Sequence, residues 1–215
     1  MKCTDCHRVV LPVVAVDIDG TLAQYHQTFA RFAWEYWNIR PRPIDAWDGV
    51  GEFEDYIRID KAMYREAKLA FRQGGMKRSL PMYDDAKEFM QVLWGLPIEV
   101  WLTTTRPWMR HDSVDPDTRF WLARNGINFH HLIFDDNKYW KLKSIVGDGR
   151  VIAVVDDLPE LLVEAREAFG PDAPLLPQRP HNRTMWERWE SGKLDSWLVA
   201  MVTNRLENWE KKHNG

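Results

Sequence analysis

The sequence predicts an α/β fold in which a parallel β-sheet is flanked by helices. Short, mostly apolar runs rich in β-branched residues recur at 13–16, 98–102 and 151–155, and the first of them has no alternation of apolar and polar positions. A strand that is buried on both faces, as in a parallel sheet, has this pattern. Segments with apolar residues at helical spacing separate these runs, as expected when helices connect parallel strands.

Length and composition indicate one domain that carries a sizeable insertion. The 215 residues are 45% hydrophobic and 28% charged, which is ordinary for a globular chain. The net charge of −3 provides no global basic field of the kind that binds long nucleic acids. No apolar run is long enough to span a membrane and residues 1–8 lack a signal-peptide pattern, so we expect a cytoplasmic location.

The first strand, at residues 11–18, delivers two carboxylates to its carboxyl end. Asp17 and Asp19 are two residues apart on an extended chain, so their side chains are expected to point roughly the same way. Gly20 then permits a sharp change of direction. Open α/β sheets place their chemistry at this end of the strands, and paired carboxylates there require a cation or a shared proton.

A helical insertion is expected directly after this strand, because no strand pattern appears between residues 24 and 78. Apolar spacing predicts one helix over 29–37 and one or two more over 53–73, with a loop at 44–51 between them. Arginine suits phosphate and tryptophan suits base stacking. The candidate substrate contacts of this type in the insertion are Arg31, Trp34, Trp47, Arg65 and Arg72.

The chain then alternates between helices and strands. Asp84 or Asp85 is expected to cap a helix that runs to Leu93. Further elements are expected as a strand at 98–102, a helix at 117–125, a strand at 129–134, a helix at 138–146, a strand at 151–155, a helix at 159–169 and an amphipathic helix at 196–209.

Two later strands also end in polar side chains. The strand at 98–102 runs into Thr103 and Thr104, whose hydroxyls suit a phosphate oxygen. The strand at 151–155 runs into Asp156 and Asp157. This second acidic strand end repeats the pattern of the first, and together they supply the oxygen ligands that Mg²⁺ prefers.

The order of these motifs resembles the haloacid dehalogenase (HAD) superfamily, which consists mostly of phosphatases. The match comprises Asp-x-Asp-Gly-Thr at 17–21, a Thr-ended strand, a lysine near the helix at 138–146 and the acidic pair at 156–157, and it covers about residues 11–26 and 80–182. It implies a Rossmann-like, HAD-like core at 11–24 and 79–182 and a small helical cap at 25–78. Residues 183–215 would form a helical extension packed on the core.

The resemblance implies a Mg²⁺-dependent phosphomonoester hydrolase. Asp17 would be the nucleophile and Asp19 the general acid, which then acts as the base for water. The implied metal ligands are Asp17, Asp19 through its backbone carbonyl, Asp156 and Asp157. The implied phosphate-binding residues are Gly20, Lys138 and Thr104. Thr103 is the alternative to Thr104.

Three lysines compete for the family's phosphate-binding position, namely Lys138, Lys141 and Lys143. Lys138 lies one turn before Leu142 on the apolar stripe of its helix, whereas Lys141 points further away. The periodicity therefore favours Lys138.

A segment near the end of the chain bears on the substrate. Gln-x-Pro-x-Asn at 178–182, followed by Trp186, Trp189 or Trp197, resembles the 5′(3′)-deoxyribonucleotidase and polynucleotide kinase/phosphatase branch. This implies a small phosphorylated substrate, most naturally a nucleoside monophosphate. The alternatives are a 3′-phosphatase for nucleic-acid ends, which a basic face around the site would favour, and a non-catalytic HAD-like binding module.

Cys3 and Cys6, with His7 beside them, form half of a zinc site or a redox pair. No second cysteine pair exists in the sequence to complete a zinc site. We therefore expect a reduced, partly exposed pair.

Overall fold

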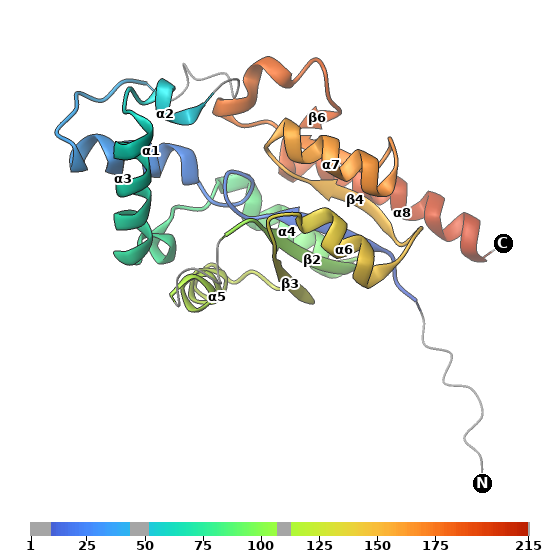
Figure 1. Cartoon of the computed structure of the whole chain (residues 1–215). Helices are drawn as coiled ribbons and strands as arrows, with labels where there is room; N and C mark the ends of the chain where they lie inside the picture. Colours follow the sequence, from blue (N-terminus) through green and yellow to red (C-terminus); the bar gives the residue numbers. More distant parts are fainter. Residues whose placement is uncertain (1–9, 44–51, 107–112, 215) are drawn as a thin grey trace, which may run out of the picture.

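Parallel strands form the centre of the molecule in the order β3-β2-β1-β4-β5-β6 (Figure 1). The computed structural model describes residues 10–43, 52–106 and 113–214. The strands are β1 (Val13–Asp17), β2 (Glu99–Thr104), β3 (His131–Phe134), β4 (Val151–Val155), β5 (Pro174–Pro177) and β6 (Ser191–Gly192). The predicted α/β class with a parallel sheet is confirmed.

The central strand β1 lies between β2 and β4, and its register sets the site. Asp17 at the end of β1 pairs with Thr103 of β2, and Val16 pairs with Val155 of β4. The chain fills one side of β1 with β2 and β3 and then crosses to β4 on the other side. Such a reversal of strand order opens a crevice at the carboxyl ends of the strands, where ligands bind in folds of this type.

Helices cover both faces of the sheet (Figure 1). One face is covered by α4 (Asp84–Gly95), α5 (Val114–Arg124) and α8 (Val199–Asn214), and the other by α6 (Lys138–Val146) and α7 (Pro159–Phe169). The side chains of β1 alternate between these two faces. Val14 and Val16 pack in the core under α4, α5 and α8, and Val13 and Ala15 pack in the core under α6 and α7. Burial on both faces explains why β1 shows no polar alternation.

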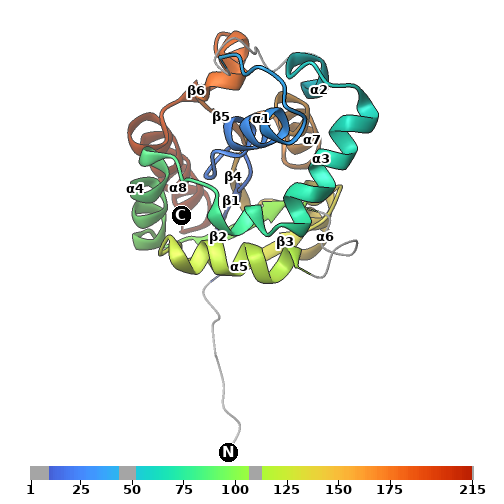
Figure 2. The same ribbon diagram turned by 90° about the vertical axis from the view of Figure 1, so that its left-hand side faces the viewer.

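A helical insertion separates β1 from α4 and lies at the carboxyl ends of the strands (Figures 1 and 2). It comprises α1 (Tyr25–Tyr36), α2 (Phe53–Tyr56), α3 (Lys61–Gln73) and the 3₁₀ helix η2 (Met76–Ser79). Phe29 of α1 and Phe71 of α3 are fully buried, with ring centroids 5.4 Å apart. The Trp34 indole N–H donates to the Ile57 carbonyl over 2.9 Å, which joins α1 to the chain after α2.

The two chain connections between the insertion and the rest of the molecule pair with each other. Ala23 and Met82 form an antiparallel bridge. The Gln24 amide donates to the Pro81 carbonyl over 2.8 Å, and the Tyr83 amide donates to the Leu22 carbonyl over 2.9 Å. We refer to residues 22–24 and 81–83 as the paired connection.

Two local predictions differ from the structure. α5 begins at Val114 rather than Asp117, because Pro116 is tolerated in the first turn of a helix, where its missing N–H is not needed. Neither Asp84 nor Asp85 caps α4, since the N-cap is Tyr83. Asp85 instead accepts two hydrogen bonds from the Arg179 guanidinium, at 2.9 and 3.0 Å.

The region expected as a helical extension contains more than a helix. The short strand β6 pairs with β5 within it, and the 3₁₀ helix η3 (Pro180–Met185) and the π-helix η4 (Leu194–Leu198) precede α8. Ser191 and Gly192 form too short a strand to give a periodic signal in the sequence.

Cys3, Cys6, His7 and Trp47, and the predicted loop at 44–51, lie outside the described residues. In the described part of the chain, every helix is either too short or too polar to cross a membrane.

Replacing Phe71 with alanine should destabilise the protein by about 3–5 kcal/mol, because it empties a buried aromatic site between α1 and α3. Urea denaturation followed by circular dichroism measures the change. Leu69→Ala is the matched control on the same helix, since Leu69 is 40% exposed and its loss should cost no more than about 0.5 kcal/mol. Equal losses in the two variants would contradict the packing described for α3.

Candidate active site

Three aspartates meet where the ends of β1 and β4 lie side by side. Asp17 is the last residue of β1, and Asp156 and Asp157 directly follow β4. All three are buried, and one ligand oxygen from each lies within 4.8 Å of the others. The sheet register therefore brings together the two acidic strand ends that the sequence predicted as neighbours.

Lys138 lies between two of these carboxylates. Its ammonium is 2.5 Å from Asp17 and 2.6 Å from Asp156, and the side chain has no exposed surface. Burial lowers the pKa of Lys138, but Asp156 and Asp17 outweigh burial and raise the pKa above its ordinary value. The lysine therefore stays charged, and it occupies the first position of α6, as the periodicity predicted.

The acidic cluster carries more negative charge than Lys138 neutralises. Burial and the neighbouring Asp156 and Asp157 raise the pKa of Asp17, even though Lys138 opposes them. Burial and Asp156 likewise raise the pKa of Asp157. Three buried carboxylates that share one ammonium are the donor set of a hard divalent cation such as Mg²⁺, and binding such a cation would let all three ionise.

Side chains from several elements hold the cluster in place. The Tyr139 hydroxyl donates to Asp156 over 2.5 Å, and the Thr21 hydroxyl donates to Asp157 over 2.8 Å. His181 Nε2 lies 2.6 Å from the other Asp157 oxygen. Burial, aided by Arg179, lowers the pKa of His181 to about 3, so its imidazole is neutral at pH 7.

The segment at 178–182 lies against this cluster. The Asn182 amide donates to the Asp157 carbonyl over 2.9 Å and to the Pro177 carbonyl over 3.0 Å. The Trp186 indole in turn donates to the Asn182 side-chain oxygen over 2.8 Å. The asparagine and a following tryptophan that the sequence singled out thus act as supports for the chain after β4.

Asp19 has separate partners and its carboxylate lies outside the acidic cluster. Arg106 binds both of its oxygens, at 2.9 and 2.6 Å, and Lys77 binds one of them. Burial raises the pKa of Asp19, but Arg106 and Lys77 outweigh burial and hold it well below its usual range. Burial lowers the pKa of Lys77 to about 7. Asp19 is therefore ionised, and its side chain does not point to the same partners as that of Asp17.

Gly20 allows the turn after β1 to approach the acidic cluster. Its φ of +98° lies in the region that favours glycine, and a Cβ atom there would overlap the Asp157 carboxylate. The Gly20 amide, expected near phosphate, donates to the Ala23 carbonyl over 2.8 Å. In this structure the glycine provides space and the turn rather than an open N–H group.

Thr103 and Thr104 are both buried at the end of β2, and strand alternation places their side chains on opposite faces of the sheet. Thr103 pairs in register with Asp17. The Thr104 hydroxyl oxygen accepts the Arg106 amide over 3.3 Å.

Lys77 and Arg106 were not predicted from the sequence as site residues. Arg106 directly follows the threonines at 103–105, and nothing in that local pattern indicates that its side chain binds Asp19. Lys77 follows the Gly74-Gly75 pair that ends α3, and nothing in its local pattern marks it as a residue that returns to the sheet.

A cavity of about 850 Å³ opens between the insertion and the sheet. Asp19, Lys77 and Arg106 line its sheet end. Arg65 and Arg72 also line the cavity, whereas the exposed Arg31 does not. Trp34 is 4% exposed and packs inside the insertion, so this indole is a structural residue.

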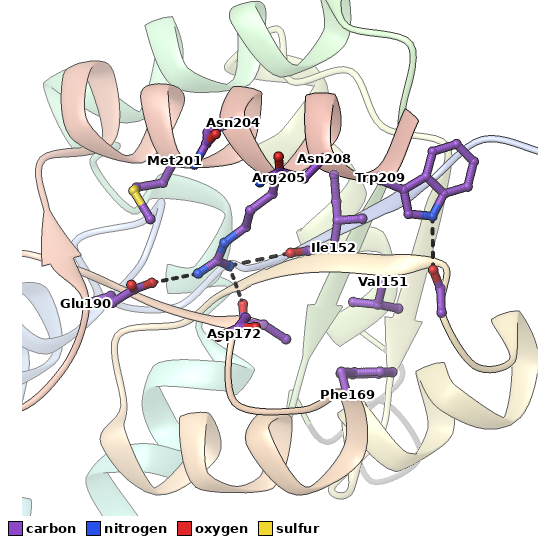
Figure 3. Close-up of a pocket in the computed structure, with 12 residues that line it drawn as sticks. Val151, Ile152, Phe169, Asp172, Glu190, Met201, Asn204, Arg205, Asn208 and Trp209 are labelled. Atoms are coloured by element: carbon purple, nitrogen blue, oxygen red, sulfur yellow. Dashed lines mark hydrogen bonds and ion pairs between the residues drawn. The ribbon is translucent and has the colours of Figure 1, made fainter. Parts of the chain in front are cut away.

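A second cavity of about 380 Å³ lies at the opposite end of β4, between α7 and α8 (Figure 3). Its central charged residue, Arg205, pairs with Glu190 over 2.7 Å and donates to the Ala173 carbonyl over 2.8 Å. Because this arginine is already bound and the aspartate cluster is at the other end of the strand, the second cavity is not part of the candidate site.

Comparison with solved structures identifies the fold. A predicted phosphatase from Clostridium acetobutylicum is 13% identical with a TM-score of 0.61, and the alignment covers 91% of this chain and 99% of that one. A conserved haloacid dehalogenase-like protein from Agrobacterium tumefaciens is 11% identical with a TM-score of 0.59, covering 90% and 99%. D,D-heptose 1.7-bisphosphate phosphatase from B. bronchiseptica, complexed with magnesium and phosphate, is 11% identical with a TM-score of 0.52, covering 90% and 99%.

No protein-family model matches the sequence, and no curated protein matches it either. At these identities the likeness is one of fold. The chain therefore has the Rossmann-like fold of the HAD phosphatases and hydrolases.

Mg²⁺ should raise the melting temperature of metal-free protein, because it relieves repulsion among Asp17, Asp156 and Asp157. At 100 times the dissociation constant the gain is about 2.7 kcal/mol, or on the order of 5–10 °C for a chain of this size. Differential scanning fluorimetry after treatment with a chelator measures the shift. Asp156→Asn should remove most of it, while Asp148→Asn, at a side chain that is 87% exposed, should keep it. An undiminished shift in Asp156→Asn would show that Mg²⁺ binds elsewhere.

Proposed function

We propose that this protein is a Mg²⁺-dependent phosphomonoester hydrolase that works through an aspartyl-phosphate intermediate. The observation that carries the proposal is the buried Asp17 carboxylate, which lies beside Lys138 and the acidic pair at 156–157 at the sheet's switch point. The fold shared with proteins described as phosphatases supports it. A non-catalytic binding module would have no use for so many buried charges, which are costly to maintain.

In the proposed reaction an Asp17 carboxylate oxygen attacks phosphorus, and the bond from phosphorus to the leaving oxygen breaks. Asp19, which takes up a proton from solvent when the substrate binds, gives that proton to the leaving oxygen, which departs as an alcohol. Asp19 then accepts a proton from water as the water attacks the aspartyl-phosphate. Inorganic phosphate leaves, Asp17 is again a free carboxylate, and Asp19 again carries a proton, which it releases to solvent when Arg106 and Lys77 bind it once more.

Asp19 can act as an acid only when it carries a proton, whereas Arg106 and Lys77 now hold it ionised. We infer that the substrate's phosphate competes for these two cations. Once they bind the phosphate, the half-buried Asp19 carboxylate loses its stabilising partners, and its pKa rises toward a value that suits proton transfer.

Mg²⁺ would be held by Asp17, Asp156 and Asp157, together with the backbone carbonyl of Asp19. When bound, it supplies positive charge to the phosphate oxygens. Lys138 and the Thr104 hydroxyl, or that of Thr103, would contribute the remaining contacts to those oxygens, since phosphoryl transfer depends chiefly on positioning and charge stabilisation.

We propose a nucleotide as the substrate. The cavity of about 850 Å³ is within the range of small-molecule sites. Tyr25, Phe53 and Tyr64 line it and offer flat rings against which a base can stack. Its lining arginines and lysines suit phosphate.

Asp17→Asn should reduce phosphate release below detection, because an amide cannot form the aspartyl-phosphate. The assay is a Mg²⁺-containing panel of ribo- and deoxyribonucleoside 5′- and 3′-monophosphates, a 3′-phosphorylated oligonucleotide and a sugar phosphate. Asp136→Asn is the control, since Asp136 is exposed near the same sheet edge. Turnover by Asp17→Asn at the wild-type rate would rule out Asp17 as the nucleophile.

Lys138→Ala should lower kcat by about 10²–10³-fold, as expected for the loss of one group that stabilises transition-state charge. Lys141→Ala on the same helix should stay close to wild type, because Lys141 is exposed. Circular dichroism of both variants separates a loss of catalysis from a loss of folding. A larger loss in Lys141→Ala would transfer the role to that residue.

A further inference from the structure

A row of basic side chains on α3 faces the cavity. Lys61, Arg65, Lys68 and Arg72 follow one another at intervals of four, three and four residues, and all four line the cavity. Residues at this spacing lie on one face of a helix. We call these four residues the basic stripe. At 1.5 Å per residue the stripe extends for about 16 Å.

The orientation of the stripe follows from the packing of the helix. Ala67 and Phe71 are fully buried on another face of α3, and Phe71 packs against rings of α1. Lys61 and Arg65 are exposed, whereas Lys68 and Arg72 are half-buried. The stripe therefore leads from the open rim of the cavity inward toward the buried Lys77 and the half-buried Asp19.

The stripe is not neutralised by the described part of the chain. Lys77 and Arg106 are bound to Asp19, but no described carboxylate lies within 4.0 Å of an amino or guanidinium group of the four stripe residues. Lys68 donates to the Tyr64 hydroxyl, which leaves its charge uncompensated. Like charges at this spacing on a helix are destabilising.

The cavity also contains acidic residues, and they come from other elements. Glu52 and Glu54 lie at the start of α2, and Glu160 lies in the first turn of α7. Burial, Asp156 and Glu52 raise the pKa of Glu160, so other acids act on this carboxyl. The glutamates of the cavity lining thus come from α2 and α7, whereas the four residues of the basic stripe come from α3.

We propose that the leaving group of the substrate carries a second phosphate and that the basic stripe binds it. This inference rests on the proposed phosphatase function and specifies its substrate class. The scissile phosphate would take the cations at the deep end, Lys77 and Arg106. A substrate with a single phosphate would provide no anion for the basic stripe. A second phosphate reaches Arg65, Lys68 or Arg72, and arginine binds it bidentately.

Such a substrate has two chemical sources, a small bisphosphate and the phosphorylated end of an oligonucleotide. The test compares kcat/KM for a nucleoside 5′-monophosphate, the matching nucleoside 3′,5′-bisphosphate and a 5′-phosphorylated trinucleotide. The bisphosphate should exceed the monophosphate by at least about ten-fold, the effect of one good charged contact. A further gain with the trinucleotide identifies the oligonucleotide end as the source, and no further gain identifies the small bisphosphate.

Arg65→Gln should reduce the ratio of bisphosphate to monophosphate kcat/KM by about ten-fold. Arg31→Gln is the matched control, because Arg31 is an exposed arginine of the same insertion that does not line the cavity, and the ratio should persist. High salt should lower the ratio in the wild type, since exposed charge contacts are screened. A ratio near one in the wild type, or equal ratios in the wild type and Arg65→Gln, overturns the inference.

Binding to Asp17→Asn, measured by calorimetry, separates this inference from the proposed function. If the wild type hydrolyses none of the substrates, the phosphatase proposal fails. The inference then stands if the bisphosphate binds about ten-fold more tightly than the monophosphate and Arg65→Gln in the same background removes the difference. Equal affinities for the two ligands overturn it.

Discussion

The Lys138 ammonium lies between Asp17 and Asp156 and thereby links the ends of β1 and β4 to the start of α6. Without this cation three carboxylates would be buried within a few ångströms of one another, at a cost that few folds tolerate. The surrounding hydrogen bonds belong to the same arrangement. Tyr139 donates to the Asp156 oxygen that Lys138 also contacts, and Thr21 and His181 bind the two oxygens of Asp157. The charge of one lysine is thus the condition for concentrating acidic groups at the switch point of the sheet.

A different ionic contact, between Lys77 and Asp19, joins the insertion to the sheet. Lys77 comes from η2 and binds Asp19, which Arg106 from the end of β2 binds from another side. Asp17 and Asp19, which are two residues apart in the sequence, therefore have different roles in the structure. Asp17 belongs to the buried cluster, and Asp19 belongs to the boundary between the sheet and the cavity. A ligand anion that enters the cavity meets Asp19's cations before it reaches Asp17.

The strands β1 to β4, their polar ends and the boundaries of α6 and α7 were predictable, because buried parallel strands have a simple pattern and carboxyl ends of neighbouring strands must meet. Lys138 was predictable from its place on the apolar stripe of α6. Lys77, Arg106 and His181 were not, because their partners lie 58, 87 and 24 residues away along the chain and no local periodicity encodes such contacts. The predicted cap of α4 was wrong for the same reason, because Asp85 forms an ion pair with Arg179, which is distant in the sequence.

The paired connection brings both crossings of the chain between the insertion and the sheet to one place. Because residues 22–24 and 81–83 are hydrogen-bonded to each other, neither crossing can shift alone without breaking backbone hydrogen bonds. Lys77 lies only four residues before Pro81 and is bound to Asp19. The position of this cation over the sheet is therefore set by the backbone of the connection as well as by its own ion pair.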